Sequence, residues 1–306
     1  MNEQAPSTSS EYQKFRSQLE SIQFLKKSLV SLDKLTDRFG ELHTSLAEEV
    51  LQLAHSMNWD TQEIFAQYIF DYLKEQIAFE QTGDYGHTDF DKIKAEILDD
   101  PQVMKQLYLP GLFLAYPLTA ILFHKYAFFK KAFLPRITPT MYGAEVGYGD
   151  GFYLWVMLKN VPGLRLTGFD ISAPAKEFAD HLLQQADISA DRFDLHVANV
   201  IDGIPLEKES LDWVLLPEVI EHLPEPEVAI AEAGSKLKPG GWLYVATMID
   251  SNHMDHISNF ESPEVVEALI TGNGFTVTDR LVYRVTDDLP DSQDRAVSLA
   301  FIAQKG

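Results

Sequence analysis

Residues 145–151 read Glu145-Val146-Gly147-Tyr148-Gly149-Asp150-Gly151, and this stretch decides the fold. It follows a short apolar run and precedes a helical pattern, so we predict a turn between a strand and a helix. Glycines at alternate positions make such a turn tight and let the backbone approach a bound nucleoside. The spacing G-x-G-x-G differs from the G-x-G-x-x-G of dinucleotide sites, and the acidic Glu145 suits a cationic ligand better than a pyrophosphate.

Short apolar runs alternate with helical stretches through the whole second half of the chain. The predicted strands are Met141–Val146, Leu164–Phe169, Phe193–Val197, Leu211–Leu216, Trp242–Met248, Phe275–Val285 and Ala296–Ala303. This alternation implies an α/β fold with a mostly parallel sheet and right-handed crossovers. The last two strands have no helical pattern between them, so we expect a hairpin at one edge of the sheet.

The first part of the chain has helical patterns only, since no alternating strand pattern appears before residue 140. We predict a disordered tail over residues 1–10, an all-helical domain over 11–135 and an α/β domain over 136–306. Apolar residues three or four apart over Glu11–Phe39 predict one amphipathic helix. The helical domain is expected to act as a lid over the substrate, as a dimerisation element, or as both.

Three further motifs follow the glycine turn in order. Asp170 ends the second predicted strand, where a carboxylate either accepts hydrogen bonds from ribose hydroxyls or caps the next helix. Glu218-Val-Ile-Glu221-His222 follows the strand Leu211–Leu216, at an edge of the sheet that faces the ligand crevice in such folds. Lys238-Pro-Gly-Gly241 is a structural turn before the fifth strand.

Taken together and in this order, these motifs resemble the class I S-adenosylmethionine-dependent methyltransferases over about residues 140–306. The resemblance implies a Rossmann-like seven-stranded sheet of order 3-2-1-4-5-7-6 and S-adenosyl-L-methionine as cofactor. Asn199 stands where the family usually places an acidic residue near the adenine. The residues that the resemblance implies in cofactor binding are Glu145, Gly147, Gly149, Gly151, Asp170, Asn199, Val200 and Glu218.

Methyl transfer depends mainly on positioning the two reactants, and a base that takes a proton from the acceptor adds to it. Histidine suits this role because its neutral form is present near physiological pH. His253 and His256 lie in the loop after the fifth strand, where packing alone is the alternative explanation. The candidate catalytic residues are His222, His256, Glu218 and His253.

The motif after the fourth strand also has the spacing of a metal site. Glu218, Glu221 and His222 share one helical face, and with His253 or His256 they offer two oxygens and two nitrogens to a divalent metal. This looks like the metal site of the small-RNA 3′-terminal 2′-O-methyltransferases and partly like that of ubiquinone-biosynthesis O-methyltransferases. We favour the alternative, in which the motif only orders the strand end and borders the pocket, as in metal-free members.

Charge and composition limit the partners. The chain has a formal net charge of −21, and residues 136–306 carry 12 Lys and Arg against 27 Asp and Glu. Such a field repels nucleic acid and anionic membranes, so we expect no DNA or membrane partner and regard RNA as disfavoured. There is no cysteine, which removes disulfides and thiolate chemistry. The start lacks a secretory pattern and prolines interrupt the longest apolar stretch, which predicts a cytoplasmic protein.

We therefore expect an O-methyltransferase of specialised metabolism that acts on a small molecule or a peptide. The aromatic-rich segment 107–134 is expected to pack the helical domain on the sheet and to line an acceptor pocket at the junction. The alternatives are a metal-dependent 2′-O-methyltransferase on RNA, an N- or C-methyltransferase, an oxidoreductase that binds a dinucleotide through Asp170, and a non-catalytic binding module. A homodimer through the N-terminal helices is also considered.

Overall fold

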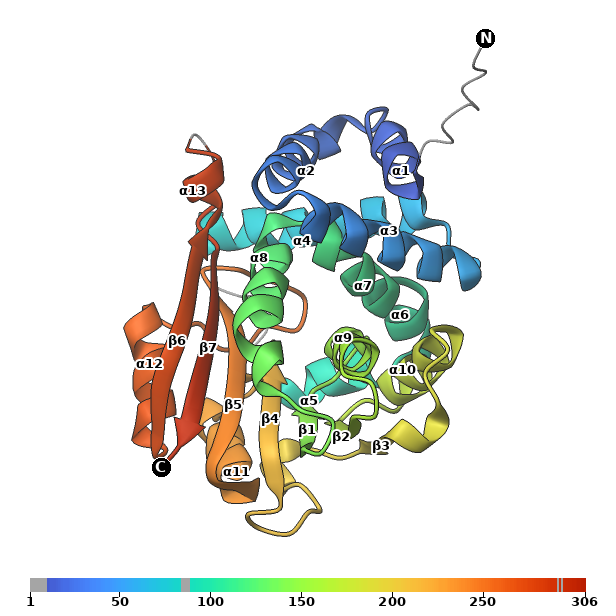
Figure 1. Cartoon of the computed structure of the whole chain (residues 1–306). Coiled ribbons are helices and arrows are strands. Elements are labelled where there is room, and N and C mark those ends of the chain that lie inside the picture. Colours follow the sequence, from blue (N-terminus) through green and yellow to red (C-terminus); the bar gives the residue numbers. More distant parts are fainter. Residues whose placement is uncertain (1–9, 84–88, 291, 293) are drawn as a thin grey trace.

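The computed structural model describes residues 10–83, 89–290, 292 and 294–306, so the predicted tail lies almost wholly outside the described residues. A seven-stranded sheet of order β3-β2-β1-β4-β5-β7-β6 runs through the centre, which confirms the expected order (Figure 1). The strands are β1 (Tyr142–Val146), β2 (Arg165–Asp170), β3 (Phe193–Val197), β4 (Leu211–Pro217), β5 (Leu237–Ile249), β6 (Phe275–Arg284) and β7 (Val297–Lys305).

Strand direction follows the predicted pattern. Strands β1 to β5 pair in parallel, whereas β7 pairs antiparallel with both β5 and β6. The hairpin at the edge is therefore confirmed, with a short helix, α13 (Val285–Asp288), in its connection. The central strand β4 is almost entirely buried, as expected for a strand covered on both faces, whereas the edge strand β6 alternates between exposed and partly buried residues.

Helices cover both faces of this sheet. On one face lie α9 (Phe152–Asn160) and α10 (Ala173–Gln185), and on the other lie α11 (Pro226–Lys236) and α12 (Pro263–Gly272). Ser172 caps α10, since its hydroxyl accepts a hydrogen bond from the amide of Ala175 at 3.1 Å. The carboxyl ends of the parallel strands point toward the N-terminal helical segments (Figure 1).

The described part of residues 10–136 is helical and contains no strand, as predicted. One expectation was wrong, because Glu11–Phe39 forms two helices rather than one. The chain turns at Ser21, and Ile22 is extended, but Leu19 and Leu25 on either side are both buried in one core. The periodic pattern therefore continues across the break. The segments are α1 (Glu11–Leu19), η1 (Gln23–Leu25), α2 (Lys26–Phe39), α3 (Glu41–Ser56), α4 (Thr61–Thr82), α5 (Phe90–Ile93), η2 (Lys94–Leu98), α6 (Pro101–Val103), η3 (Met104–Tyr108), α7 (Leu109–Leu118), α8 (Ala120–Phe128), η4 (Phe129–Phe133) and η5 (Leu134–Arg136).

The helical segments share a core with the sheet. Tyr116 of α7 stacks on Phe152 of α9 with ring centroids 3.6 Å apart, and Trp59 stacks on Phe178 of α10 at 5.6 Å. These rings belong to one continuous apolar cluster that includes residues of α1 to α4 and one face of the sheet. A division of the chain at residue 135 stays a prediction.

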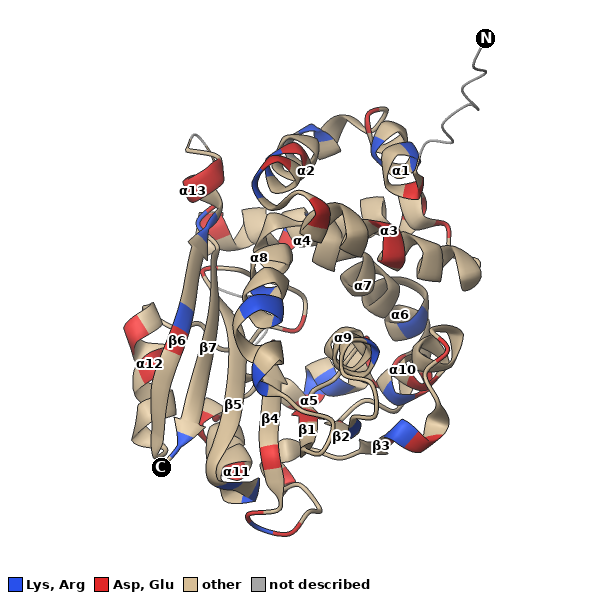
Figure 2. Ribbon diagram, in the orientation of Figure 1, with Lys and Arg blue, Asp and Glu red and all other residues tan. Residues whose placement is uncertain are grey.

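Acidic and basic residues are interspersed on α2, whereas α13 is acidic (Figure 2). Arg38 of α2 forms an ion pair with Asp288 of α13 at 3.4 Å, which joins the helical segments to the β6–β7 connection. Within the described ranges, no single helix is long and apolar enough to cross a membrane. Helical residues Pro101–Leu118 and Ala120–Arg136 reach that length and composition only as a pair, with a bend of 72° between them.

Candidate active site

The glycine turn after β1 has the geometry that its sequence requires. Gly147 and Gly149 have φ angles of +70° and +47°, which side chains other than glycine rarely adopt. A β-carbon on Gly147 would lie 2.5 Å from the side chain of Val219, so the turn packs directly on the residue after Glu218. A β-carbon on Gly149 would have no heavy atom within 4 Å. The backbone is therefore open toward a ligand at this point.

Three buried carboxylates surround this turn. Asp170 accepts hydrogen bonds from the amides of Gly149 and Ser172, both at 2.8 Å, so it serves the turn and the start of α10 together. Asp150 accepts one from the amide of Phe152 at 2.9 Å. Oε2 of Glu145 and Oδ2 of Asp150 are buried and have no hydrogen-bond partner among the described residues.

The pKa values of these carboxyls are all raised, and burial is the main cause. The pKa of Glu145 lies well above its usual range, and the nearby Asp150 and Asp170 add to the effect of burial. Burial raises the pKa of Asp150 to about 8 and also raises the pKa of Asp170. A cation in this site would favour the ionised carboxylates.

The remaining predicted cofactor residues line one cavity with Asp170, except for Gly151. Asn199 caps a short 3₁₀ turn, since Oδ1 accepts from the amide of Ile201 at 3.1 Å, and Val200 is buried beside it. Phe90 of α5 lines the same cavity. Gly151 does not line that cavity and instead begins α9, where its α-carbon packs close to Ala179.

Glu218 follows β4 and pairs with a lysine from the helical segments. Its φ angle is +52°, and its carboxylate accepts a hydrogen bond from Nζ of Lys125 of α8 at 2.5 Å. The lysine side chain is 0% exposed and the glutamate side chain 17%. Oε1 of Glu218 is buried and has no partner among the residues described.

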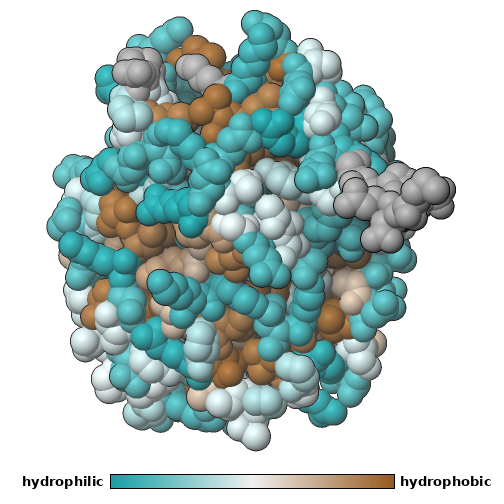
Figure 3. Space-filling model, turned by 45° about the horizontal axis from the view of Figure 1, so that its top comes forward, coloured by the Kyte–Doolittle hydropathy of each residue, from teal (hydrophilic) through white to brown (hydrophobic). Residues whose placement is uncertain are grey.

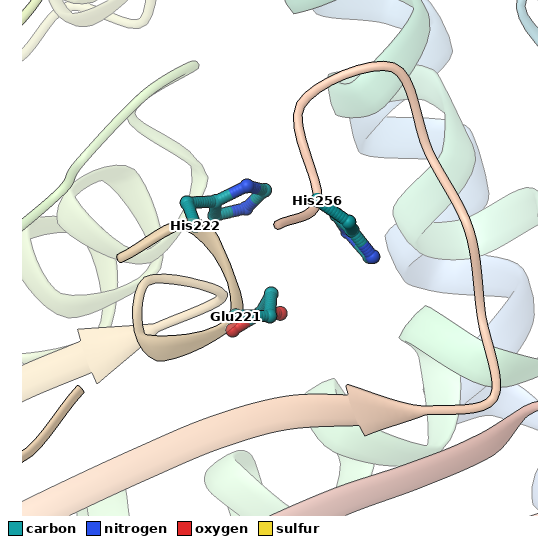
Figure 4. Close-up of side chains that lie close together, drawn as sticks. All are labelled: Glu221, His222 and His256. Atoms are coloured by element: carbon teal, nitrogen blue, oxygen red, sulfur yellow. The ribbon is translucent and has the colours of Figure 1, made fainter. Parts of the chain in front are cut away.

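Glu221, His222 and His256 form a cluster in which one ligand atom from each residue lies within 4.8 Å of the others (Figure 4). Glu221 and His222 belong to the metal set that the sequence offers as an alternative, and His256 is one of the two histidines considered for it. Glu218 is instead paired with Lys125, and His253 lies 3.1 Å from Asp255. Burial and the neighbouring Glu218 raise the pKa of Glu221 to about 7.

His222 and His256 are held by backbone carbonyls. Nδ1 of His222 lies 2.9 Å from the carbonyl oxygen of Asp255 and 3.6 Å from its carboxylate, and Nδ1 of His256 lies 2.7 Å from the carbonyl oxygen of Ser251. Burial works against protonation of His222, but the carboxylates of Asp255 and Glu221 outweigh it, and the pKa of His222 is raised. Burial and the nearby His222 lower the pKa of His256 to about 3.

Asp255 lies in the loop after β5, between His253 and His256. Its carboxylate accepts a hydrogen bond from the hydroxyl of Tyr108 at 2.6 Å and lies 3.1 Å from Nδ1 of His253. Burial works to raise the pKa of Asp255, but His222 and His253 outweigh it and hold that pKa below its usual range. The ring of His253 packs beside those of Tyr68 of α4 and Tyr108.

Gln76 of α4 fastens the same loop from the other side. Its side-chain amide donates to the carbonyl oxygen of Asp250 at 3.0 Å and accepts from the amide of Asn252 at 2.8 Å. Asp250 has a φ angle of +52°, so the loop leaves β5 through a left-handed residue. The helical segments therefore hold the backbone on which His253 and His256 stand.

One cavity of about 550 Å³ brings these groups together. It is lined by Glu145, Asp170 and Glu218 from the strand ends, by His222, His253 and His256, and by apolar residues of α4, α7 and α8. Glu221 and Lys125 do not line it.

Residues 144–245 match the family model described as a methyltransferase domain. This part of the chain is therefore a methyltransferase domain, and the strand order of its sheet is the one that the resemblance to the class I S-adenosylmethionine-dependent methyltransferases implies. The chain is 32% identical to the mitochondrial ubiquinone biosynthesis O-methyltransferase of Candida albicans over 34% of this chain and 31% of that protein. It is 27% identical to the ubiquinone biosynthesis O-methyltransferase of Hydrogenovibrio crunogenus over 41% of this chain and 50% of that protein. The chain thus spans a third to a half of these relatives.

Among solved structures, this chain is similar to a geranyl diphosphate methyltransferase in complex with S-adenosylmethionine. The TM-score is 0.50 at 15% identity, and the match covers 65% of this chain and 90% of that one. At this identity the similarity shows the fold alone. The fold and its order of strands agree with the sequence-based expectation.

The family cofactor fits the residues around the glycine turn. S-adenosylmethionine carries an ammonium and a sulfonium, and the turn presents two buried carboxylate oxygens that lack partners, on Glu145 and Asp150. The open backbone at Gly149 leaves room for a ligand, and Asp170 ends the neighbouring strand. A dinucleotide, which the sequence analysis considers as an alternative ligand, carries an anionic pyrophosphate and would not pair with the carboxylate oxygens of Glu145 and Asp150.

Sequence reasoning missed three residues that build the site, Gln76, Tyr68 and Lys125, whereas Tyr108 belongs to the aromatic-rich segment that was expected to line a pocket. Lys125 had a visible signal, because it is the only Asp, Glu, Lys or Arg between Leu107 and Phe129. A charged residue in such a run must find a buried partner. Gln76 and Tyr68 carry no comparable signal, since both stand on an ordinary helical pattern.

Proposed function

We propose that this methyltransferase transfers a methyl group from S-adenosyl-L-methionine to a hydroxyl oxygen of a small-molecule acceptor. The observation that carries the proposal is the continuity of one cavity from the acidic glycine turn to the histidine loop and the apolar helices above it. The names of the O-methyltransferase relatives agree with this proposal. The high negative charge makes a small neutral acceptor a better partner than RNA.

Glu145 and Asp150 would hold the cationic part of the cofactor, and Asp170 would accept hydrogen bonds from its ribose. Val200 and Phe90 would border the base, next to Asn199. S-adenosylmethionine supplies an electrophilic methyl group when bound. The acidic turn selects a cation, and the tight packing of Gly147 on Val219 fixes the turn relative to Glu218.

His222 is our choice of general base. Its Nδ1 points to a carbonyl oxygen, which can only accept, so the proton stays on Nδ1 and Nε2 carries the lone pair. The carboxylate of Asp255 near the same ring stabilises the imidazolium that forms when the acceptor loses its proton.

The other predicted catalytic residues suit this role less well. His256 is nearly buried, and a pKa of about 3 makes it a weak base. His253 packs against Tyr68 and Tyr108 and is better placed to border the acceptor than to take its proton. Glu218 is engaged with Lys125, which stabilises its charge.

Two measurements test the proposal. Calorimetry of the full chain should detect binding of S-adenosylmethionine and of S-adenosylhomocysteine. Methyl transfer from a deuterated methyl donor to a panel of phenols and aliphatic alcohols, followed by mass spectrometry and NMR of the product, should place the label on oxygen. Label on nitrogen or carbon across matched amine and enol acceptors would contradict the proposal.

The role of His222 has its own test. His222→Asn should lower the rate of transfer by about 10²–10⁴-fold, the usual contribution of a general base, with cofactor affinity unchanged. His181→Asn is the matched control, because His181 is exposed on α10 outside the cavity. In the wild type, kcat/KM should rise with pH through a value above the usual histidine pKa, since the base acts in its neutral form. A profile without this rise counts against His222.

A further inference from the structure

Beyond the glycine turn and His222, the cavity continues between the helices as an arm that the proposed function leaves unassigned. Leu73 and Ile77 of α4 and Ile121 and Leu122 of α8 line this arm, with Leu289 after α13. Ser28 and Ser31 of α2 also belong to the lining. The walls of the arm are therefore mainly apolar, with hydroxyls at α2 and carboxylates on Glu80 of α4 and on Asp294.

Apart from three histidines, the ionisable Asp, Glu, Lys and Arg side chains found in the described lining of the cavity are all acidic. Among the described residues that line it there is no Lys or Arg, and Lys125, which is fully buried, is paired with Glu218. An anionic group of the acceptor would meet carboxylates without a Lys or Arg to pair with, which is costly in a poorly solvated site. Seven side chains in the lining carry carboxylates: Glu80, Glu145, Asp150, Asp170, Glu218, Asp255 and Asp294.

The surface near α2 and α4 is apolar where the arm reaches it. Phe24 and Phe70 lie with ring centroids 6.0 Å apart, and both are exposed, as are Val30 and Ile77. Figure 3, with the helical end of the molecule turned forward, shows apolar surface between hydrophilic areas. Ile77 is 53% exposed and also lines the cavity, so it marks an opening.

We propose that this arm is the acceptor site and that it takes an uncharged, mainly apolar molecule whose hydroxyl lies toward His222. The arm excludes acceptors with a carboxylate, sulfate or phosphate group. Apolar walls favour an aliphatic or aromatic body, because its surface leaves water on binding. This inference rests on the proposed function for the position of the reacting oxygen.

Binding of two phenols of similar length tests the inference without requiring turnover. The full chain is saturated with S-adenosylhomocysteine, and calorimetry then measures the affinities of 4-pentylphenol and of 4-(4-hydroxyphenyl)butanoate. The neutral phenol should bind more than tenfold more tightly than the anion. Equal affinity, tighter binding of the anion, or no binding of 4-pentylphenol would overturn the inference.

A substitution at the opening locates the binding. Ile77→Lys places a cation in the lining of the arm. Because the position is exposed, the fold should tolerate the substitution. The ratio of the affinity for 4-pentylphenol to that for 4-(4-hydroxyphenyl)butanoate should fall at least threefold. Ala78→Lys is the matched control, because Ala78 is the next residue of α4, exposed and outside the lining. If the ratio of the two affinities changed equally in Ile77→Lys and Ala78→Lys, or changed in neither, the phenols would bind elsewhere.

The two failures can be told apart. Loss of S-adenosylhomocysteine binding in the wild type would refute the proposed function. Intact binding of S-adenosylhomocysteine with equal affinity for the two phenols would refute the acceptor class alone.

Discussion

The substitution Gln76→Leu should detach the loop that carries His253 and His256 from helix α4, which holds it by two hydrogen bonds. Gln76 is 3% exposed, and its amide makes two hydrogen bonds to the backbone on either side of Ser251. Leucine keeps the approximate volume and removes both bonds. The carbonyl of Asp250 and the amide of Asn252 then lose these partners in a buried place.

The cost follows from those two bonds. Each is worth about 1 kcal/mol net, and a buried polar group left without a partner costs about 1–3 kcal/mol, so we expect roughly 2–4 kcal/mol against the present loop conformation. Because the loop carries His256 and the Asp255 carbonyl that holds His222, its displacement should lower the transfer rate by about 10–100-fold. Cofactor affinity should not change, since Gln76 does not contact Glu145 or Asp170.

Three readouts decide this prediction. Amide hydrogen exchange should become faster at Asn252, single-turnover transfer should slow, and calorimetry with S-adenosylhomocysteine should match the wild type. Gln76→Glu keeps the acceptor for the amide of Asn252 and loses the donor to the carbonyl of Asp250. Its amide exchange rate at Asn252 and its transfer rate should therefore lie between those of the wild type and of Gln76→Leu. Gln67→Leu, at an exposed position of the same helix, is the control. A Gln76→Leu variant that exchanges like the wild type at Asn252, or that keeps its transfer rate, would refute the reasoning.

Three further predictions follow from the buried charges. Asp170→Ala should weaken cofactor binding by about 1–3 kcal/mol, the range for losing hydrogen bonds to a charged group, and unchanged affinity by calorimetry would reject the ribose assignment. Lys125→Met leaves the carboxylate of Glu218 unpaired and should lower the free energy of unfolding by about 2–4 kcal/mol, as measured by denaturant titration. Adding Glu218→Gln to this variant should restore most of the lost stability. No recovery in the double variant would contradict the pairing. Cofactor binding should release a proton, because Asp150 with a pKa of about 8 is largely protonated at pH 7 and a cation favours its ionised form. Affinity should then rise with pH up to about 8, and binding enthalpies that are the same in phosphate and Tris buffers would argue against it.

The sequence predicts the sheet well because its signals are local. The glycine turn, Asp170 and the motif at Glu218 each follow their own strand within a few residues, and parallel strands bring their carboxyl ends to one edge. The edge hairpin was predictable for the same reason, since β6 and β7 are neighbours in the chain.

Contacts between distant parts of the chain gave no such signal. Lys125 and Glu218 are 93 residues apart, and Gln76 meets Asp250 across 174. Helical spacing does not apply to the motif at Glu218, because Glu218 has a left-handed backbone and a short 3₁₀ turn follows it. Glu218 therefore pairs with Lys125, whereas Glu221 and His222 lie beside His256. The break at Ser21 was missed because both helices turn apolar residues to one core, so the period is preserved.

These contacts give the helical segments a larger role than that of a cover. A separable lid would meet the sheet through a small, fairly polar interface, as domains that move relative to one another usually do. Here α7 stacks an aromatic ring on α9 at 3.6 Å, α8 places a fully buried lysine on Glu218, and α4 fixes the histidine loop through Gln76. The last two contacts reach the chain just after β4 and just after β5. The position of the catalytic groups relative to the cofactor therefore depends on the helices, and a change in the apolar packing of α4 or α8 acts on the same groups as a change in the strands.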